Sequence, residues 1–541
     1  MAEKYKAKAG WGVTNAYCVD IFHLIVIPNP SADGTFGGYV LTRIPDMHIT
    51  MGATIDDFSN EMARLCQRYG LKTRSDHAKD ILLIYVDDLD LIRAYFSGYI
   101  TEGNRNSMQI ECGNIEFRSW KEFTKEDSLE TLFDLREQFI EAEFPYLTPA
   151  QGSRKALKHE AKGVASEVFP GQLSDLSVVY SAVHGGVLYN RPEDGIIRNL
   201  FGFDICSAYI YSLVFKKHAS TPLEITNPND WEDYIGSKDY GSIGIYEITY
   251  NSLFRGIGCF RDRWDERLKP GVHKVQIGLS NIDLKSIIDC INPGVISVKC
   301  LMLYSFKLDY LPEVFRKSCI KEFIKKQTLP KGTAAYRNQK VRLNAGSFGN
   351  LLYEAKSILE IADVREQSKK LKEIKKDATS APQWGVYTMS YTKETIYRVG
   401  AKLVGWRYSD TDSIYCNDDS RNLEVIEEYN QQTRESNSRL IKELGYDEML
   451  GDDAKYLLDL GTFSLEARIK QFRAWGVKMY AYETEEGEVI QKASGCDKEK
   501  LPKDAETVFS LGYKPFGCSE RTLITPGHYY IINDRRVNKA R

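Results

Sequence analysis

The sequence reads Tyr408-Ser409-Asp410-Thr411-Asp412-Ser413 between two short segments of β-branched and aromatic residues. These segments, Val404–Tyr408 and Ile414–Cys416, bracket the two aspartates as the strands of a hairpin do. Aspartate is a common turn residue, so a pair in a turn is by itself more often structural than functional. A hairpin tip that directs carboxylates into a cleft can nevertheless hold a divalent cation.

Another carboxylate follows an apolar strand earlier in the chain. The segment reads Phe203-Asp204-Ile205-Cys206-Ser207-Ala208-Tyr209, and the apolar run over Ser207–Phe215 predicts a helix after the strand. From this strand end Asp204 can face Asp412 across a sheet. Two such carboxylates can bind two Mg²⁺ ions about 3.5–4 Å apart, the spacing of in-line phosphoryl transfer. Positioning and charge neutralisation supply most of that catalysis.

A third element combines a cation with an amide. It reads Lys340-Val341-Arg342-Leu343-Asn344, and Lys340 and Asn344 lie four residues apart, on one face of a helix. That pairing suits a triphosphate, although a solvated lysine beside a surface amide is the commoner explanation for such a pair alone.

Together the three elements resemble, in order and residue type, the motifs of the family B DNA polymerases. Residues 204–209 resemble the palm motif DxxSLYPS, residues 340–349 the fingers motif KxxxNSxYG, and residues 408–413 the motif YxDTDS. Further matches point to the protein-primed subgroup found in bacteriophages. Val183-His184-Gly185-Gly186 is similar to its template-contacting YxGG turn, Lys478-Met479-Tyr480 to its KxY motif, and Lys492-Ala493-Ser494-Gly495 to a stretch before the thumb.

The resemblance implies a catalytic role for each matching acid. Asp204 and Asp412 would ligate two Mg²⁺ ions, with Mn²⁺ as an alternative metal, and Asp410 would assist nearby. The backbone carbonyl of Ile205 would complete one coordination sphere.

The resemblance also implies binding residues. Tyr209 would stack under the incoming sugar and exclude a ribose 2′-hydroxyl, and Lys340, joined by Lys326 or Arg337, would contact the triphosphate. Phe348 would pack near the new base pair. The nucleotide-binding set is therefore Ser207, Tyr209, Lys326, Arg337, Lys340, Asn344 and Phe348, and the primer and template set is Gly185, Gly186, Lys478 and Tyr480.

Three departures from the family pattern stand out. Ile210 replaces the proline after the motif tyrosine, and Val183 replaces the tyrosine of the glycine turn. The segment from Asn344 to Gly349 is one residue longer than NSxYG. The helix after Asn344 must therefore shift in register or bulge.

The fold implied is a multidomain α+β right-hand polymerase, with palm, fingers and thumb, preceded by a ribonuclease-H-like domain of the exonuclease type. A chain of 541 residues exceeds one hydrophobic core. Helical spacing predicts helices at Ile55–Tyr69 and Leu423–Leu444, and the apolar run Val178–Tyr189 predicts a strand. The expected parts are residues 1–165 (exonuclease-like), 166–215 (palm, first part), 216–314 (TPR1-like insertion), 315–350 (fingers), 351–386 (TPR2-like insertion), 387–498 (palm, second part) and 499–541 (thumb).

The first domain lacks a complete exonuclease motif. Such a site needs an Asp-x-Glu pair to bind its own metals, and the nearest match, Asp20-Ile21-Phe22, has phenylalanine in place of glutamate. The remaining acids would be Asp88, within Asp87–Asp90, and Asp127, which closes Phe123–Asp127. We expect a domain that keeps the fold and guides DNA but has little or no proofreading activity.

Composition agrees with an intracellular globular protein but gives no basic signature. Hydrophobic residues make up 43% and charged residues 27% of the chain, and the net charge is −3. Only local charge meets phosphates, and cations cluster at Arg316–Lys340 and Lys369–Lys376. The 11 cysteines are scattered without a CxxC pair, which disfavours a zinc site. No signal peptide or apolar span is apparent, so we expect a cytoplasmic monomer.

The function predicted is template-directed addition of dNTPs to a DNA 3′ end, started from a terminal-protein primer in phage or plasmid replication. Its partners would be template and primer DNA, dNTPs and that terminal protein. The TPR1-like insertion would contact the terminal protein, and the TPR2-like insertion would favour processivity and strand displacement. Two alternatives stay open: a non-catalytic DNA-binding scaffold, and a nucleotidyltransferase that acts without a template.

Overall fold

The computed structural model divides into two compact units, each described by itself. The first comprises Met1–Glu160 with Glu322–Gly346, and the second Ala161–Lys321 with Ser347–Arg541. The residues described are 4–6, 16–18, 21–29, 35–44, 46–69, 80–87, 89–96, 100–103, 107–110, 115–119, 149–190, 195–251, 271–291, 295–331, 333–476, 478–493, 501–510, 512–513, 515, 529–532 and 535–538. Asp20, Asp88 and Asp127 lie outside them.

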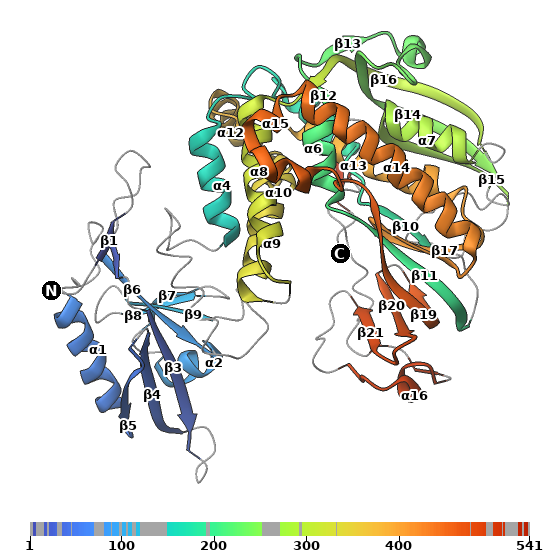
Figure 1. The fold of residues 1–541 in the computed structure, drawn as a ribbon. Helices are drawn as coiled ribbons and strands as arrows, with labels where there is room; N and C mark the ends of the chain where they lie inside the picture. The colour runs from blue at the N-terminus through green and yellow to red at the C-terminus, as the bar shows by residue number, and fades with distance from the viewer. Residues whose placement is uncertain are drawn as a thin grey trace. The chain divides into compact units, whose positions relative to one another are not determined.

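The first unit contains a sheet with the strand order β5-β4-β3-β6-β9-β8-β7, and β1 and β2 join it beside β6 (Figure 1). Strands β3, β6 and β9 are parallel, whereas β3, β4 and β5 pair antiparallel. The elements are β1 (Lys4–Lys6), β2 (Ala16–Cys18), β3 (Ile21–Pro28), β4 (Phe36–Ile44), β5 (His48–Gly52), α1 (Ile55–Tyr69), β6 (Asp80–Val86), α2 (Leu89–Phe96), β7 (Ile100–Gly103), β8 (Ser107–Ile110), β9 (Ile115–Ser119), α4 (Pro149–Glu160) and α9 (Ala334–Gly346). Helix α8 (Glu313–Thr328) begins in the second unit and ends in the first.

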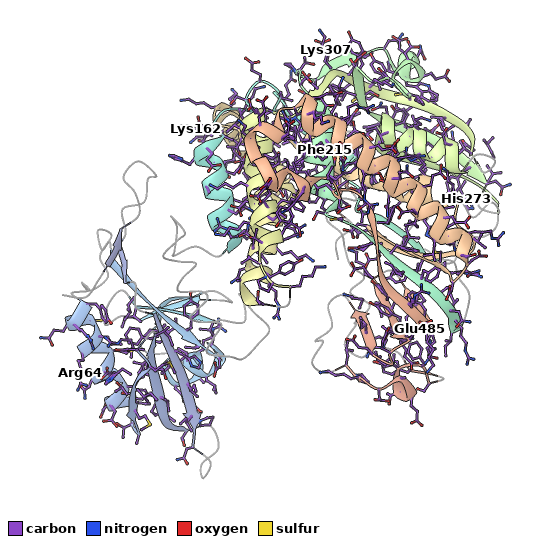
Figure 2. The ribbon with its side chains drawn as sticks, viewed as in Figure 1. Arg64, Lys162, Phe215, His273, Lys307 and Glu485 are labelled. Carbon is purple, nitrogen blue, oxygen red and sulfur yellow. The ribbon has the colours of Figure 1, made fainter. Side chains whose placement is uncertain are left out.

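Strand β3 buries one of its faces in the hydrophobic core of this unit. Phe22 and Leu24 are buried, while Ile25 next to them is 40% exposed. Helix α1 packs Phe58, Met62 and Leu65, which recur at helical spacing, into the same core. Its charged side faces solvent, where Figure 2 shows Arg64. The predicted helix Ile55–Tyr69 is confirmed with these bounds.

The helices α4 and α9 pack together in the same unit. The hydroxyl of Ser153 donates a hydrogen bond to the backbone carbonyl of Arg342 at 2.8 Å. The absence of a side chain at Gly346 allows the two helices to approach this closely, because a Cβ there would overlap the Ser153 hydroxyl. Helix α9 therefore ends against α4.

The second unit is built on a seven-stranded sheet with the order β10-β17-β18-β11-β19-β20-β21. Every neighbouring pair is antiparallel. The strands are β10 (Val187–Asn190), β11 (Ile197–Ile205), β17 (Trp406–Thr411), β18 (Ser413–Asn417), β19 (Phe463–Gly476), β20 (Met479–Thr484) and β21 (Val489–Ala493). The helices around it are α5 (Leu173–Ser181), α6 (Ala208–Phe215), α10 (Phe348–Leu351), α11 (Tyr353–Leu359), α12 (Val364–Lys376), α13 (Pro382–Gly400), α14 (Ser420–Glu443), α15 (Tyr446–Leu450) and α16 (Ala505–Val508), with the 3₁₀ helix η4 (Gly451–Leu457).

A second sheet in this unit comes from the inserted residues after α6. Its strands are β12 (Lys217–Ala219), β16 (Val295–Tyr310), β14 (Tyr240–Asn251) and β15 (Val272–Ser280) in that order, with β13 (Glu224–Thr226) paired to β16. The 3₁₀ helix η3 (Pro228–Tyr234) and α7 (Asn281–Ile291) accompany it, and a separate hairpin comprises β22 (Tyr529–Ile532) and β23 (Arg535–Asn538).

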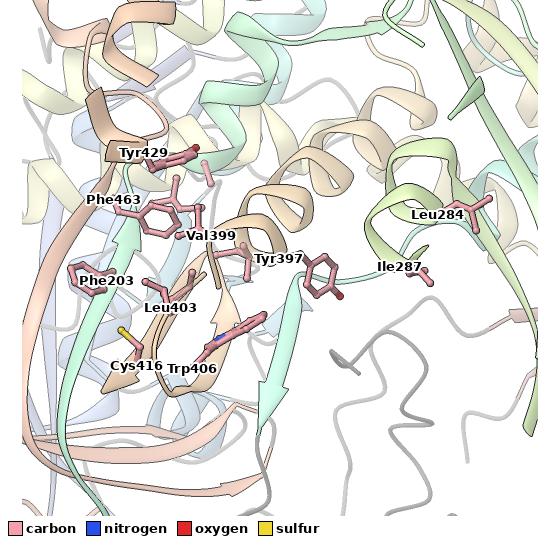
Figure 3. Packing of buried hydrophobic residues seen from close by; sticks show 14 of the residues in the cluster. Phe203, Leu284, Ile287, Tyr397, Val399, Leu403, Trp406, Cys416, Tyr429 and Phe463 are labelled. Atoms are coloured by element: carbon pink, nitrogen blue, oxygen red, sulfur yellow. The ribbon is translucent and has the colours of Figure 1, made fainter. Parts of the chain in front are cut away.

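One hydrophobic core joins the two sheets of this unit. Figure 3 shows Phe203 and Cys416 from the sheet beside Leu403, with Leu284 and Ile287 of α7 in the same cluster. Phe215, at the end of α6, is also buried (Figure 2). The seven-stranded sheet is thus fixed from one side, which leaves its other face to carry a site.

The strand predicted over Val178–Tyr189 was wrong except at its last three residues. Residues up to Ser181 form the helix α5, and a strand starts only at Val187. A short apolar run does not distinguish a buried helix from a buried strand. Among the helices that the structure describes, none combines the length and apolarity that a membrane span needs.

Candidate active site

Strand register places two of the predicted carboxylates in one row across the sheet. Asp410 of β17 pairs with Ser413 of β18, and Ser413 pairs on its other side with Asp204 of β11. Directly paired residues share a face, so Asp204 and Asp410 lie on the same face two strands apart, about 10 Å between backbones. Both side chains are partly exposed. The row therefore directs two carboxylates toward a shared space in front of the sheet.

The third carboxylate comes from the hairpin tip itself. The backbone N–H of Ile205 donates to the Asp412 carbonyl at 3.0 Å, and the Asp412 N–H donates to the Asp410 carbonyl at 2.8 Å. These two bonds hold the tip against the end of β11, beside Asp204. The expected hairpin is confirmed as β17 and β18 with Asp412 between them.

Backbone strain gathers at this place. Five non-glycine residues of the described chain have positive φ, and three of them, Ser207, Thr411 and Lys478, lie at the site. Their φ values are 49°, 66° and 57°. Such conformations cost roughly 1–3 kcal/mol each and are typical of functional sites, because the surrounding structure must enforce them. Thr411 is β-branched, for which this conformation is a clear outlier.

Lys478 reaches over the hairpin from the loop before β20. Its Nζ lies 3.6 Å from a carboxylate oxygen of Asp410 and 3.5 Å from the hydroxyl of Thr411. Its backbone N–H donates to the Tyr408 hydroxyl at 3.0 Å. The side chain is 35% exposed. A cation thus stands at the edge of the carboxylate row, available to an anionic ligand.

Tyr480, predicted to hold the primer, is buried among the aromatic side chains of the sheet. It is 4% exposed, its hydroxyl lies 3.2 Å from that of Tyr415, and its ring centre lies 4.8 Å from that of Tyr408. Burial raises the pKa of the Tyr415 and Tyr480 hydroxyls, so both stay protonated at neutral pH. The aromatic cluster supports β20, and through it Lys478.

Tyr209 and Phe348, predicted to form the nucleotide pocket, are in direct contact. Their rings stack at 4.0 Å between centres with an interplanar angle of 20°. Burial raises the pKa of Tyr209, and the nearby carboxylates of Asp412 and Asp410 raise it further. The hydroxyl of Tyr209 therefore remains protonated and lies within electrostatic reach of both acids.

The segment Asn344–Gly349, which is one residue longer than the motif that it resembles, contains a break between two helices. Helix α9 ends at Gly346 and α10 begins at Phe348. Ser347 between them has φ −92° and ψ −101°, outside the helical region. This break takes up the additional residue, and Phe348 still meets Tyr209.

The glycine turn, Val183–Gly186, lies directly on the hairpin of β17 and β18. A Cβ on Gly186 would lie 2.5 Å from the Cα of Thr411, and Val187 pairs with Thr411 in the sheet. Gly185 and Gly186 therefore bring backbone, with no side chains, next to the carboxylates.

The remaining predicted nucleotide residues belong to the first unit. Lys340 and Asn344 are exposed on α9, and Arg337 is partly exposed. Lys326 is 8% exposed, with its Nζ 5.0 Å from the centre of the Phe323 ring. The hydrogen bonds of Gln339 to Glu322, 2.8 and 2.9 Å long, join α9 to α8 within this unit.

The donor atoms at the hairpin fit Mg²⁺ in kind. They are carboxylate and carbonyl oxygens, which hard cations prefer, and Mg²⁺ is usually held by one or two carboxylates together with substrate phosphates. Within the described part of the chain no group of three or more His, Cys, Asp or Glu side chains is arranged to hold a metal by itself. A site of this kind would depend on the substrate for the rest of its ligands.

Two features escaped the sequence reasoning. One is the aromatic cluster that contains the tyrosines at 408, 415, 480 and 482; only the last two, which alternate along one strand, give a local signal. The other is a hydrogen bond from His184 to Gly278, residues 94 positions apart, for which the sequence carries no signal.

Comparison with known proteins adds evidence about the fold. No protein-family model matches the chain, and no curated protein matches its sequence. Among solved structures, Phi29 DNA polymerase complexed with primer-template DNA and incoming nucleotides matches with TM-score 0.57 and 14% identity, covering 89% of this chain and 92% of that one. The same enzyme with primer-template DNA gives TM-score 0.56 at 14% identity, covering 89% and 93%. With single-stranded DNA it gives TM-score 0.53 at 13% identity, again covering 89% and 93%. These likenesses show the fold; at such identity they do not show the activity.

Proposed function

We propose that this chain is a template-directed DNA polymerase of the family B type, related to the protein-primed subgroup, which adds dNTPs to a DNA 3′ end. The observation that carries the proposal is the meeting of Asp204, Asp410 and Asp412 with the Tyr209–Phe348 stack at one end of the sheet. The elements concerned are far apart in the sequence. The fold shared with a polymerase bound to DNA and nucleotides supports it.

Asp204 and Asp412 are the proposed ligands of two Mg²⁺ ions, with Mn²⁺ as an alternative and the Ile205 carbonyl as a further donor. When bound, these ions would neutralise the charge that develops on the transferred phosphoryl group. The protein contributes position: the Ile205 to Asp412 hydrogen bond of 3.0 Å fixes the two acids relative to each other. Asp410, paired with Lys478, is the weaker participant.

Tyr209 and Phe348 are the proposed sugar and base contacts of the incoming nucleotide. The ring of Tyr209 would leave no space for a ribose 2′-hydroxyl, and so would select deoxyribonucleotides. Ser207, Lys340 and Asn344, with Lys326 or Arg337, are the proposed contacts to the triphosphate.

Primer and template would be held around the hairpin. Lys478 would contact the primer near its 3′ end, and Tyr480 would act by supporting it from below. The Gly185–Gly186 turn would contact the template strand through its backbone. The same proposal includes the palm, fingers and thumb assignments, the exonuclease-like domain and priming by a terminal protein. These parts of it rest on the resemblance to the family.

Helix α12 supports a role of the TPR2-like insertion in holding DNA during processive, strand-displacing synthesis. Four of its exposed cations recur at i, i+4, i+7 and i+11, a single stripe about 16 Å long. The buried residues Gln367, Leu371 and Ile374 lie on the opposite side. The stripe consists of Arg365, Lys369, Lys372 and Lys376.

The experiment that tests the proposal measures template direction. A labelled primer is annealed to four templates that differ only in the first templating base, and each is given one dNTP at a time with Mg²⁺ or Mn²⁺. Incorporation of the complementary nucleotide alone supports a template-directed polymerase. Incorporation without regard to template would indicate a template-independent transferase, and none on any template would favour the scaffold.

A further inference from the structure

The glycine turn, Val183–Gly186, is held on two sides. On one side it lies on the hairpin of β17 and β18, the proposed catalytic hairpin, because a Cβ at Gly186 would lie 2.5 Å from Thr411 Cα and 2.7 Å from its Cγ2. Thr411 stands between Asp410 and Asp412. The backbone between the two acids therefore supports the turn from this side.

On the other side the turn is tied to β15 of the inserted sheet. The Nε2 atom of His184 lies 2.6 Å from the backbone carbonyl oxygen of Gly278. A carbonyl oxygen can only accept, so Nε2 carries the proton and donates. Gly278 is pressed against the end of α5, since a Cβ there would lie 2.7 Å from the Ser181 carbonyl carbon.

The partner of His184 is itself anchored. Gly278 pairs with Ile245 in the sheet. Two residues later, the Ser280 hydroxyl donates to that of Ser390 on α13 at 2.8 Å. Close by, the buried Lys393 of α13 pairs with Asp283 of α7 at 2.8 Å. Strand β15 is thus fixed to the long helix behind the seven-stranded sheet, and the histidine connects the turn to this support.

We propose that His184 is a positioning residue that holds the glycine turn in place on the catalytic hairpin, and so couples the inserted sheet to template binding. The inference rests on the proposed function, in which this turn contacts the template strand. The motif YxGG leaves the second position open, so the resemblance assigns no role to this histidine. Its side chain acts through Gly278 and does not itself need to touch DNA.

The test compares three substitutions in the full chain. His184→Leu removes the donor, and His184→Asn keeps a polar group too short to reach Gly278. Each should raise the Kd and the KM for primer–template about fivefold, the usual effect of one hydrogen bond, with kcat and the KM for dNTP unchanged. His184→Gln can still donate an N–H to the carbonyl and should restore binding to within about twofold.

The control is Ser220→Ala, which removes a 3.1 Å hydrogen bond to the Lys307 carbonyl elsewhere in the inserted sheet. It should leave primer–template binding unchanged, and thermal unfolding of every variant reports its stability. Wild-type binding by both His184→Leu and His184→Asn would overturn the inference, as would failure of His184→Gln to restore it. If the wild-type chain neither binds nor extends primer–template, the proposed function fails, and this inference with it, before any variant is compared.

Discussion

The nine-stranded sheet of the first unit and the seven-stranded sheet of the second unit differ in how their carboxylates are placed. In the second unit, register lines Asp204 and Asp410 up on one face, and both remain partly exposed. In the first unit, the residue at the expected glutamate position is Phe22, which is 3% exposed in the hydrophobic core. The nearby Asp87 accepts a hydrogen bond from His23 at 2.8 Å.

The difference shows what a carboxylate site requires beyond acidic residues. At the hairpin, Asp204 and Asp410 share one face of the sheet and stay partly exposed, as the proposed binding of a cation and a phosphate requires. In the first sheet one ligand position has become part of the core, and another acid is engaged by a histidine. The contrast supports nucleotide transfer in the second unit and little or no proofreading in the first.

The largest effect expected separates acids of the two sheets. Asp204→Asn keeps the size of the side chain but removes the charge that a metal ion needs, so primer extension should fall at least about 10²–10³-fold. Asp87→Asn is the matched control in the first sheet and should leave extension within about twofold. Single-turnover extension rates measure both. Equal losses of extension rate in Asp204→Asn and Asp87→Asn would contradict the proposed difference between the two sheets.

A second prediction asks whether the missing glutamate can be restored. Phe22→Glu places a charge in a packed core, so it should destabilise the protein by about 3 kcal/mol or more and yield no exonuclease. Ile25→Glu, on the same strand but 40% exposed, should change stability little. Thermal unfolding and 3′ trimming of a labelled single strand report the outcome. A stable Phe22→Glu variant that trims DNA would refute this account of the first unit.

A third prediction concerns the nucleotide pocket. Tyr209→Val removes the ring beside the carboxylates, so discrimination against ribonucleotides should fall about 10- to 100-fold. Tyr211→Phe, two residues along the same helix and packed against Gly461, should leave discrimination unchanged. The measurement is the ratio of kcat/KM for dNTP and NTP. Unaltered discrimination in Tyr209→Val would remove this residue from the pocket.

The smallest effect expected concerns the stripe on α12. Replacing its four cations by glutamine should weaken DNA binding several-fold at low salt and lower the slope of log Kd against log salt by about 1 for each phosphate that the helix no longer neutralises. Lys274→Gln, at a lysine paired with Glu247 at 2.8 Å, serves as the control. If the variant with all four cations replaced had the same salt slope as the wild type, the stripe would contact water and not DNA.

Parts of the fold could be predicted from the sequence because their signals are local. The helix at residues 55–69 follows from apolar residues at helical spacing, and the hairpin follows from β-branched and aromatic segments around a turn. The apolar run after residue 178 misled, because neither its length nor its composition separates helix from strand.

Residues of the candidate site could be predicted only where they belong to a recognisable sequence motif. Asp204, Asp410 and Asp412 were predicted from their motifs, but the row that joins Asp204 to Asp410 passes through Ser413, whose pairing depends on strands some 200 residues apart. The burial of Tyr480 depends on Tyr408 and Tyr415, which no local pattern connects to it. Tertiary packing decided these positions.

The most direct test of the central claim is extension of a labelled primer on a longer template, with all four dNTPs and Mg²⁺, by the wild-type chain and by Asp412→Ala. Asp418→Ala, an acid just past the end of β18, controls for loss of charge alone. The account predicts full-length product from the wild type and the control and none from Asp412→Ala. Extension that survives in Asp412→Ala would contradict the assignment of the catalytic hairpin.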